Sequence, residues 1–201
     1  MEMAKRMLYT PVFHIDTNMI NAYGKLPAMS QLEKWAKGEV ILINMSNVSF
    51  NEAQQGNNAK RTKKALSQIF TLVDESVDGS NPDYQKVAKA IFSDGVKDDN
   101  QRNDVKIVCD AIKWNAILVT NDGDSKKQPG GILGNADKLK DYVKIMGDDE
   151  AVEFVNKKIE ERDNRNREIA KITGKELPEW TGKDNAKHLH YTKCNIETEV
   201  V

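Results

Sequence analysis

The chain has few cysteines, no long apolar run and almost no net charge. Only Cys109 and Cys194 are cysteines, and because they lie too far apart for a metal-ligand spacing we expect a reduced, cytoplasmic chain. No segment approaches the roughly 18 apolar residues that cross a bilayer, so we expect no membrane partner. Pro11 and Asp16 interrupt the N-terminal segment, which argues against a signal peptide. A net charge of −1 excludes a general attraction to nucleic acid, so any polyanion must bind a local basic patch.

Short aliphatic segments alternate with helical patterns along the chain. This alternation predicts an α/β fold, a three-layer α/β/α sandwich with a short parallel sheet and right-handed crossovers. We expect strands at 12–15, 40–43, 116–119 and 142–146, and helices at 17–23, 30–37, 46–56, 58–73, 82–95 and 104–114. A charged helical run at 148–173 precedes a polar tail. The 201 residues thus suit one domain at 7–147 with a C-terminal helical extension at 148–201.

Four acidic residues stand at positions where a sheet can bring them together. Asp16 follows the first predicted strand, and Asp122 follows the strand at 116–119 through Thr120-Asn121. If these two strands are neighbours, both carboxylates lie at the carboxyl edge of the sheet, where open α/β folds bind ligands. Glu52 and Asp104 can reach the same edge from helices. Carboxylates are the natural ligands of Mg²⁺ and Mn²⁺, so the quartet predicts a divalent metal site.

Each acid also has a local structural explanation. Asp104 can cap the helix that it begins, and Ser49 to Glu52 has the spacing of a capping box. Asp16 and Asp122 can begin turns or cap helices. The four residues in this order favour the metal site over four separate coincidences. His14, on the first predicted strand, is expected to be a hydrogen-bonded core histidine.

The segments around these acids resemble the PIN domain family, and in particular VapC-type toxins. The resemblance covers about residues 8–146. It rests on Phe13-His14-Ile15-Asp16-Thr17-Asn18, on Glu52 early in its helix, on Asn103-Asp104 followed by Ala111, and on Ile117-Leu118-Val119-Thr120-Asn121-Asp122. The resemblance implies an α/β/α sandwich with a Mg²⁺- or Mn²⁺-dependent ribonuclease activity. Many relatives are toxins of toxin–antitoxin pairs, so it also implies an antitoxin protein and a second copy of the chain as partners.

The resemblance further assigns roles to residues. Asp16, Glu52, Asp104 and Asp122 would be the catalytic, metal-binding acids, with Asp124 as an alternative or additional ligand. Thr17, Asn18, Thr120 and Asn121 would support them.

Basic residues near the acids suggest a path for RNA. The densest basic run gives Lys60, Arg61, Lys63 and Lys64, while Arg102 and Lys126 flank Asp104 and Asp122. A solvated helix face explains such a run equally well. The alternative function for the whole chain is a catalytically inactive PIN-like module that binds protein or RNA. A phosphatase or a DNA nuclease that uses the same metal site also remains open.

Overall fold

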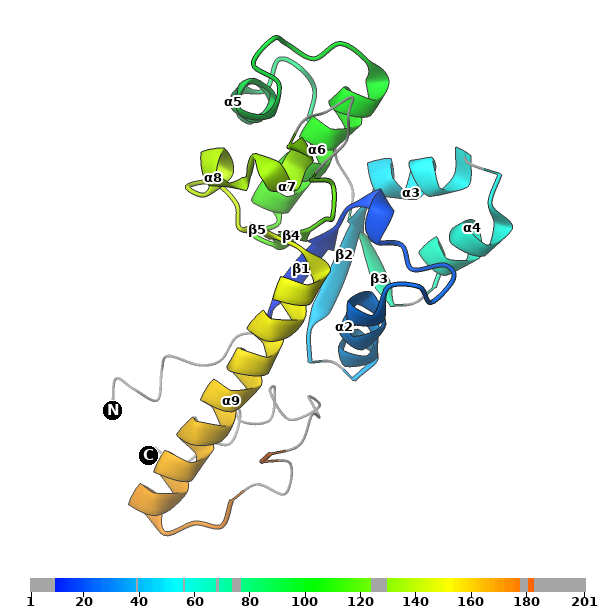
Figure 1. Cartoon of the computed structure of the whole chain (residues 1–201). Coiled ribbons are helices and arrows are strands. Elements are labelled where there is room, and N and C mark those ends of the chain that lie inside the picture. Colours follow the sequence, from blue (N-terminus) through cyan, green and yellow to red (C-terminus); the bar gives the residue numbers. More distant parts are fainter. Residues whose placement is uncertain are drawn as a thin grey trace.

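A five-stranded parallel sheet forms the centre of the computed structural model (Figure 1), which describes residues 10–38, 40–55, 57–67, 69–73, 77–123, 130–177 and 181–182. The strands are β1 (Val12–Ile15), β2 (Leu42–Ser46), β3 (Phe70–Val73), β4 (Ile117–Val119) and β5 (Ile145–Met146). They lie in the order β3-β2-β1-β4-β5, and every neighbouring pair is parallel. The first strand and the strand at 116–119 are thus neighbours, which is the condition on which the convergence of Asp16 and Asp122 depended.

Helices join the strands and cover both faces of the sheet, which confirms the α/β/α sandwich. They are α2 (Pro27–Lys37), α3 (Asn47–Gln55), α4 (Ala59–Ala65), α5 (Pro82–Ile91), α6 (Asp99–Lys113), α7 (Gly131–Gly134), α8 (Ala136–Leu139) and α9 (Asp148–Thr173), with a 3-10 turn η1 (Thr17–Met19). One core cluster packs α2 and the start of α9 against one face, and a second packs α5 to α8 against the other. Among the described helices, none is both long and apolar enough to cross a membrane.

The β3 strand corrects the prediction of one helix over 58–73. The helix α4 ends at Ala65, and residues 70–73 pair with β2 at the edge of the sheet. Pairing with β2 satisfies the backbone hydrogen bonds of this short apolar segment. The spacing of its apolar residues is also compatible with a helix, so the sequence pattern did not predict the strand. The second strand was also misplaced, because it begins at Leu42 rather than Val40. The helix predicted at 17–23 is reduced to the three residues of the 3-10 turn η1.

The helix α9 has the bounds predicted from its charged run. It ends at Gly174, which takes the left-handed conformation (φ 69°) that favours glycine at a helix C-terminus. Its first half is part of the core, because Ala151 and Val155 are buried and Phe154 meets the Phe13 ring edge-on at 6.2 Å. The boundary between domains at 147 and 148 stays a prediction.

His14 is buried at the centre of the sheet, yet neither ring nitrogen has a hydrogen-bond partner among the described residues. The expectation of a hydrogen-bonded histidine was therefore wrong. Burial favours the neutral ring and lowers the pKa of His14 from 6.5 to about 4. The folded chain thus binds this proton only at a much lower pH than the unfolded chain does.

We expect His14 to make stability fall with acidification. Because its folded-state pKa is depressed, its stabilising effect is complete above about pH 6.5 and is lost as the pH falls toward 4. Between pH 7 and 5 the free energy of unfolding should fall by about 2 kcal/mol because of His14. Urea unfolding of wild type and H14L at both pH values measures this fall. The difference in free energy of unfolding between the two proteins should change by this amount in favour of H14L as the pH is lowered. A difference that does not change with pH contradicts the assignment.

Candidate active site

The candidate site lies where the chain changes direction across the sheet. From β1 the chain moves outward through β2 and β3, and it then returns to the other side of β1 to form β4. This switch point lies at the carboxyl ends of the two central strands, which is where open α/β folds bind ligands, and we refer to the polar residues gathered there as the crevice. Asp16 follows β1 directly, and Thr120 follows β4 directly. Polar side chains from sequence positions about a hundred residues apart thereby meet.

Asp16 is the buried centre of this crevice, with only 6% of its surface exposed. One carboxylate oxygen accepts a hydrogen bond from the backbone N–H of Thr17 at 2.5 Å. The other accepts from the Thr120 hydroxyl and from the Asn18 amide, both at 2.7 Å. The Asn18 amide also lies 3.2 Å from the Thr120 hydroxyl. Donors from both strand ends therefore fix the direction of the Asp16 carboxylate.

The pKa of Asp16 is raised from 3.8 to about 6. Burial is the main cause, and the negative charges of Glu52 and Asp122 raise it further. The hydrogen bonds from Thr120 and Thr17 act in the opposite direction because they favour the ionised form. This rise in pKa corresponds to about 3 kcal/mol, which is the free energy by which the fold disfavours the ionised form of Asp16. A positive charge beside Asp16 would relieve that cost.

Glu52 reaches the crevice from α3. It accepts a hydrogen bond from the Thr17 hydroxyl and another from the Asn103 amide at 2.7 Å. The backbone N–H of Ser49, which a capping box would pair with Glu52, instead donates to the Ser46 hydroxyl. The capping-box explanation of Glu52 was therefore wrong, since Glu52 is held by residues far away in the sequence. Asn103 stood in a segment that carried the resemblance but was not predicted as a site residue, and its contact with Glu52 shows that it belongs to the site.

Asp104 lies inside α6 rather than at its start. The helix begins five residues earlier, and Asp98 caps it by accepting from the backbone N–H of Gln101 at 2.9 Å. The explanation of Asp104 as a helix cap was therefore wrong. It is partly buried in the second turn, next to Asn103, whose amide donates to Glu52. The longer helix brings this turn to the edge of the sheet where Glu52 lies.

Asp122 is positioned by the chain around α7. Its carboxylate accepts from the backbone N–H of Ile132 at 3.0 Å, and its own N–H donates to the Thr120 hydroxyl at 3.0 Å. Gly131 makes this approach possible: a Cβ there would lie 2.2 Å from the Asp122 carbonyl oxygen, and its φ of 44° is also left-handed.

Asn121 turns away toward α9. Its side-chain NH2 group donates to the Asp148 carboxylate at 2.9 Å, and its side-chain oxygen accepts from the Asp148 backbone N–H at 3.4 Å. Asn121 thus ties the first turn of α9 to the end of β4. Its backbone N–H lies 3.5 Å from the Asn18 side-chain oxygen, so Asn121 connects the long helix to the crevice.

The donor set fits a hard divalent cation in its chemistry. Asp16, Glu52 and Asp122 offer carboxylate oxygens, and the latter two are near enough to act on the charge of Asp16. In the described part of the chain, however, no three His, Cys, Asp or Glu side chains lie close enough to hold an ion as they stand. Instead each of the three carboxylates accepts hydrogen bonds from neighbouring donors. Asp124 lies outside the described residues.

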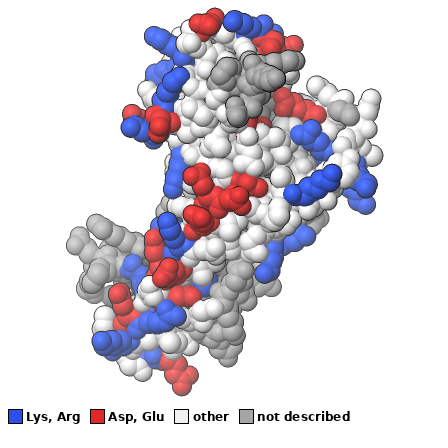
Figure 2. Space-filling model, viewed as in Figure 1, with Lys and Arg blue, Asp and Glu red and all other residues white. Residues whose placement is uncertain are grey.

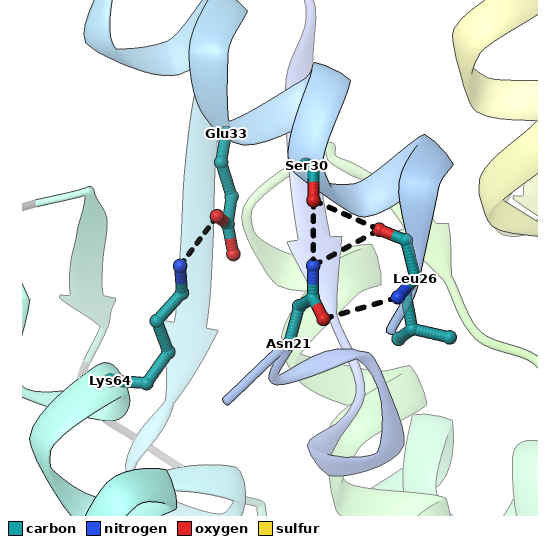
Figure 3. Close-up of polar contacts among 5 residues, drawn as sticks. All are labelled: Asn21, Leu26, Ser30, Glu33 and Lys64. Atoms are coloured by element: carbon teal, nitrogen blue, oxygen red, sulfur yellow. Dashed lines mark hydrogen bonds and ion pairs between the residues drawn. The ribbon is translucent and has the colours of Figure 1, made fainter. Parts of the chain in front are cut away.

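The predicted RNA-binding residues divide into several environments. Arg61 donates to the Thr17 carbonyl at 2.5 Å, and Lys64 forms an ion pair with the buried Glu33 at 2.5 Å (Figure 3). Arg102 pairs with Asp99 within α6. Lys60 and Lys63 are exposed. Lys126 lies outside the described residues.

Charge is distributed unevenly over the surface. Figure 2 shows basic side chains along the side of the molecule where Figure 1 places α3 and α4. Acidic side chains gather nearer the middle of this face, around the start of α9, whose first turn contains three acids. The basic helix α4 therefore supplies the local positive charge that the overall composition lacks.

We expect the Asp16 carboxyl to titrate near pH 6 in metal-free protein. Side-chain ¹³C NMR measures this pKa directly. T120V should raise it, because a hydrogen bond to the ionised form is lost, and E52Q should lower it, because a negative charge is removed. An Asp16 midpoint near 4, or shifts of the opposite sign, contradicts this description of the crevice.

Gly131 should tolerate no side chain. G131A forces the Asp122 segment away and should destabilise the protein by roughly 2 kcal/mol or more, as for other strained or overpacked positions. The control is G134A in the same short helix, where a Cβ meets its nearest atom at 3.4 Å and φ is not left-handed. Urea unfolding compares the two variants. Equal stabilities would contradict the close approach.

Comparison with known proteins finds a likeness to solved structures alone. No family model and no curated protein matches the chain. One chain of the crystal structure of VapBC2 from Rickettsia felis bound to a DNA fragment from their promoter matches with a TM-score of 0.41 and 17% identity. The match covers 68% of this chain and 98% of that one. A likeness at this level assigns neither family nor activity, so the crevice itself is the basis for a function.

Proposed function

We propose that this chain is a metal-dependent endoribonuclease that hydrolyses RNA phosphodiester bonds. One observation carries the proposal: a buried carboxylate, Asp16, with a pKa raised to about 6, lies at the switch point of a parallel sheet and feels the charges of Glu52 and Asp122. A strongly perturbed carboxylate in a crevice, with a specific set of charged neighbours, is typical of functional sites. The resemblance of the surrounding segments to PIN domains supports the same reaction.

Mg²⁺ or Mn²⁺ is the proposed cofactor, with Asp16, Glu52, Asp104 and Asp122 as its ligands and Asp124 as an additional one. When bound, such an ion lowers the pKa of a bound water and stabilises charge on a phosphoryl oxygen. Asp16, Glu52 and Asp122 accept hydrogen bonds from neighbouring donors, and because a carboxylate offers about four lone-pair sites, each would keep capacity for the ion. These hydrogen bonds would hold the acids in place around it.

The other polar residues of the crevice orient the acids. Thr120 and Asn18 hold one oxygen of Asp16, and the second oxygen, which accepts the Thr17 N–H, keeps lone-pair capacity for a ligand. Thr17 and Asn103 hold Glu52 in the same way. Removing such outer partners costs metal sites about 10- to 100-fold in affinity or activity.

Single-stranded or looped RNA is the proposed substrate, because its backbone and bases are accessible. We further propose that the chain is the toxin of a toxin–antitoxin pair in the cytoplasm, with an antitoxin and a second copy of itself as partners. The resemblance and the paucity of cysteines support this setting.

Replacement of Asp16 by asparagine tests the mechanism. D16N should lower Mn²⁺-dependent cleavage of a fluorogenic RNA by more than about 100-fold, because it removes a proposed ligand rather than an outer partner. The control is D137N, a change at an exposed acid on α8 that should cleave as wild type does. DNA and a small phosphate ester, assayed in parallel, distinguish a ribonuclease from a DNA nuclease or phosphatase.

A folded D16N protein that cleaves RNA at the wild-type rate would refute the mechanism. Wild-type protein that cleaves nothing with Mn²⁺ would favour a binding module instead. Circular dichroism of both variants establishes that they are folded.

A further inference from the structure

Tyr23 is an exposed aromatic ring on a loop that is held in a fixed shape. The side chain is 55% exposed, and it lies between η1 and α2. Asn21 closes this loop: its amide donates to the Leu26 carbonyl at 3.0 Å and to the Ser30 hydroxyl at 2.9 Å, and its oxygen accepts from the Leu26 N–H at 3.2 Å (Figure 3). A loop clamped at both ends presents the ring without a large cost in conformational entropy.

Positive charges surround the Tyr23 ring. The ammonium of Lys60, from α4, lies 5.2 Å from the ring centroid, and that of Lys25 lies 5.9 Å away. The phenol hydroxyl donates to Asn58 at 3.1 Å. The ring therefore has its hydroxyl held by Asn58, more than half of its side chain exposed and two lysine ammonium groups over it, a combination that suits a base and its flanking phosphates.

A continuous set of contacts joins Tyr23 to the acidic crevice. Asn58, which holds the phenol, also caps α4 by accepting from the Arg61 N–H at 3.1 Å. The Arg61 guanidinium donates to the Thr17 carbonyl, and the Thr17 hydroxyl donates to Glu52. The ring and the acids therefore belong to one polar network, which fixes the orientation of the ring relative to the crevice.

We propose that Tyr23 is a stacking platform for a base of single-stranded RNA, with Lys25 and Lys60 binding the adjacent phosphates. This inference rests on the proposed ribonuclease function and identifies the part of the surface that holds its substrate. Base stacking on an aromatic ring is stronger than a cation–π contact at an exposed site, so an incoming base displaces the lysines. The displaced ammonium groups remain close enough to neutralise the backbone on either side of that base.

Tyr142 provides a matched control. It is 52% exposed, and the Lys86 ammonium lies 5.8 Å from its ring centroid, so its surroundings imitate those of Tyr23. It follows α8, whereas α4 lies across the sheet on another side of the molecule (Figure 1). A general effect of removing an exposed tyrosine beside a lysine would appear in both variants, whereas a substrate platform affects only Tyr23.

The experiment measures binding of a fluorescein-labelled single-stranded RNA dodecamer by anisotropy, with EDTA present to prevent cleavage. Y23L should raise Kd by about 5- to 150-fold, the loss that corresponds to one stacked base. Y23F keeps the ring and should bind nearly as wild type does, as should Y142L. K60A should make the slope of log K against log salt shallower by about 0.7, the value for one phosphate contact on a single strand.

Unchanged binding in Y23L, or an equal loss in Y142L, overturns the platform and favours a protein as the partner of this surface. Cleavage by the same proteins with Mn²⁺ separates the two proposals. Tyr23-dependent binding without any cleavage refutes the nuclease and leaves the platform standing. Cleavage and binding that are both indifferent to Y23L refute the platform alone.

Discussion

The carboxylate of Asp16, buried between the ends of β1 and β4, is the group around which the crevice is arranged. Three donors from both strand ends favour its charge, yet burial and two neighbouring acids outweigh them and keep its pKa near 6. A fold gains no stability from burying an acid that it must leave partly protonated. A ligand that carries positive charge would relieve this cost, which is the physical ground for the proposed metal site.

The position of this acid follows from topology. Because β1 and β4 are parallel neighbours but far apart in sequence, their carboxyl ends bring together side chains that no local contact could join. The crossover helices then add Glu52 from α3 and Asn103 from α6. Gly131 lets the next segment approach Asp122 closely enough to donate to it. The crevice thus collects groups from the ends of β1 and β4, from α3 and α6, and from the segment at Gly131.

Sequence patterns predicted the elements whose signal is local and failed where distant partners decide. The apolar run before Asp16 and the charged run of α9 each identified one element correctly. The strand β3 was missed because apolar residues after Ala65 continue a helical spacing, and only pairing with β2 distinguishes the two structures. Glu52 was open to a local explanation because Ser49 has the right spacing, whereas its partners Thr17 and Asn103 are distant.

A polyanion can approach an acidic crevice only if positive charge beside it compensates the repulsion. With a net charge of −1 the chain has no general attraction to offer, so that charge must be local. The helix α4 supplies it, and Arg61 fixes its position by donating to the carbonyl of Thr17. The hydroxyl of this same threonine donates to Glu52. Thr17 therefore contacts both an acid of the crevice and the basic helix α4, and it joins the two parts of the surface that a polyanion would meet.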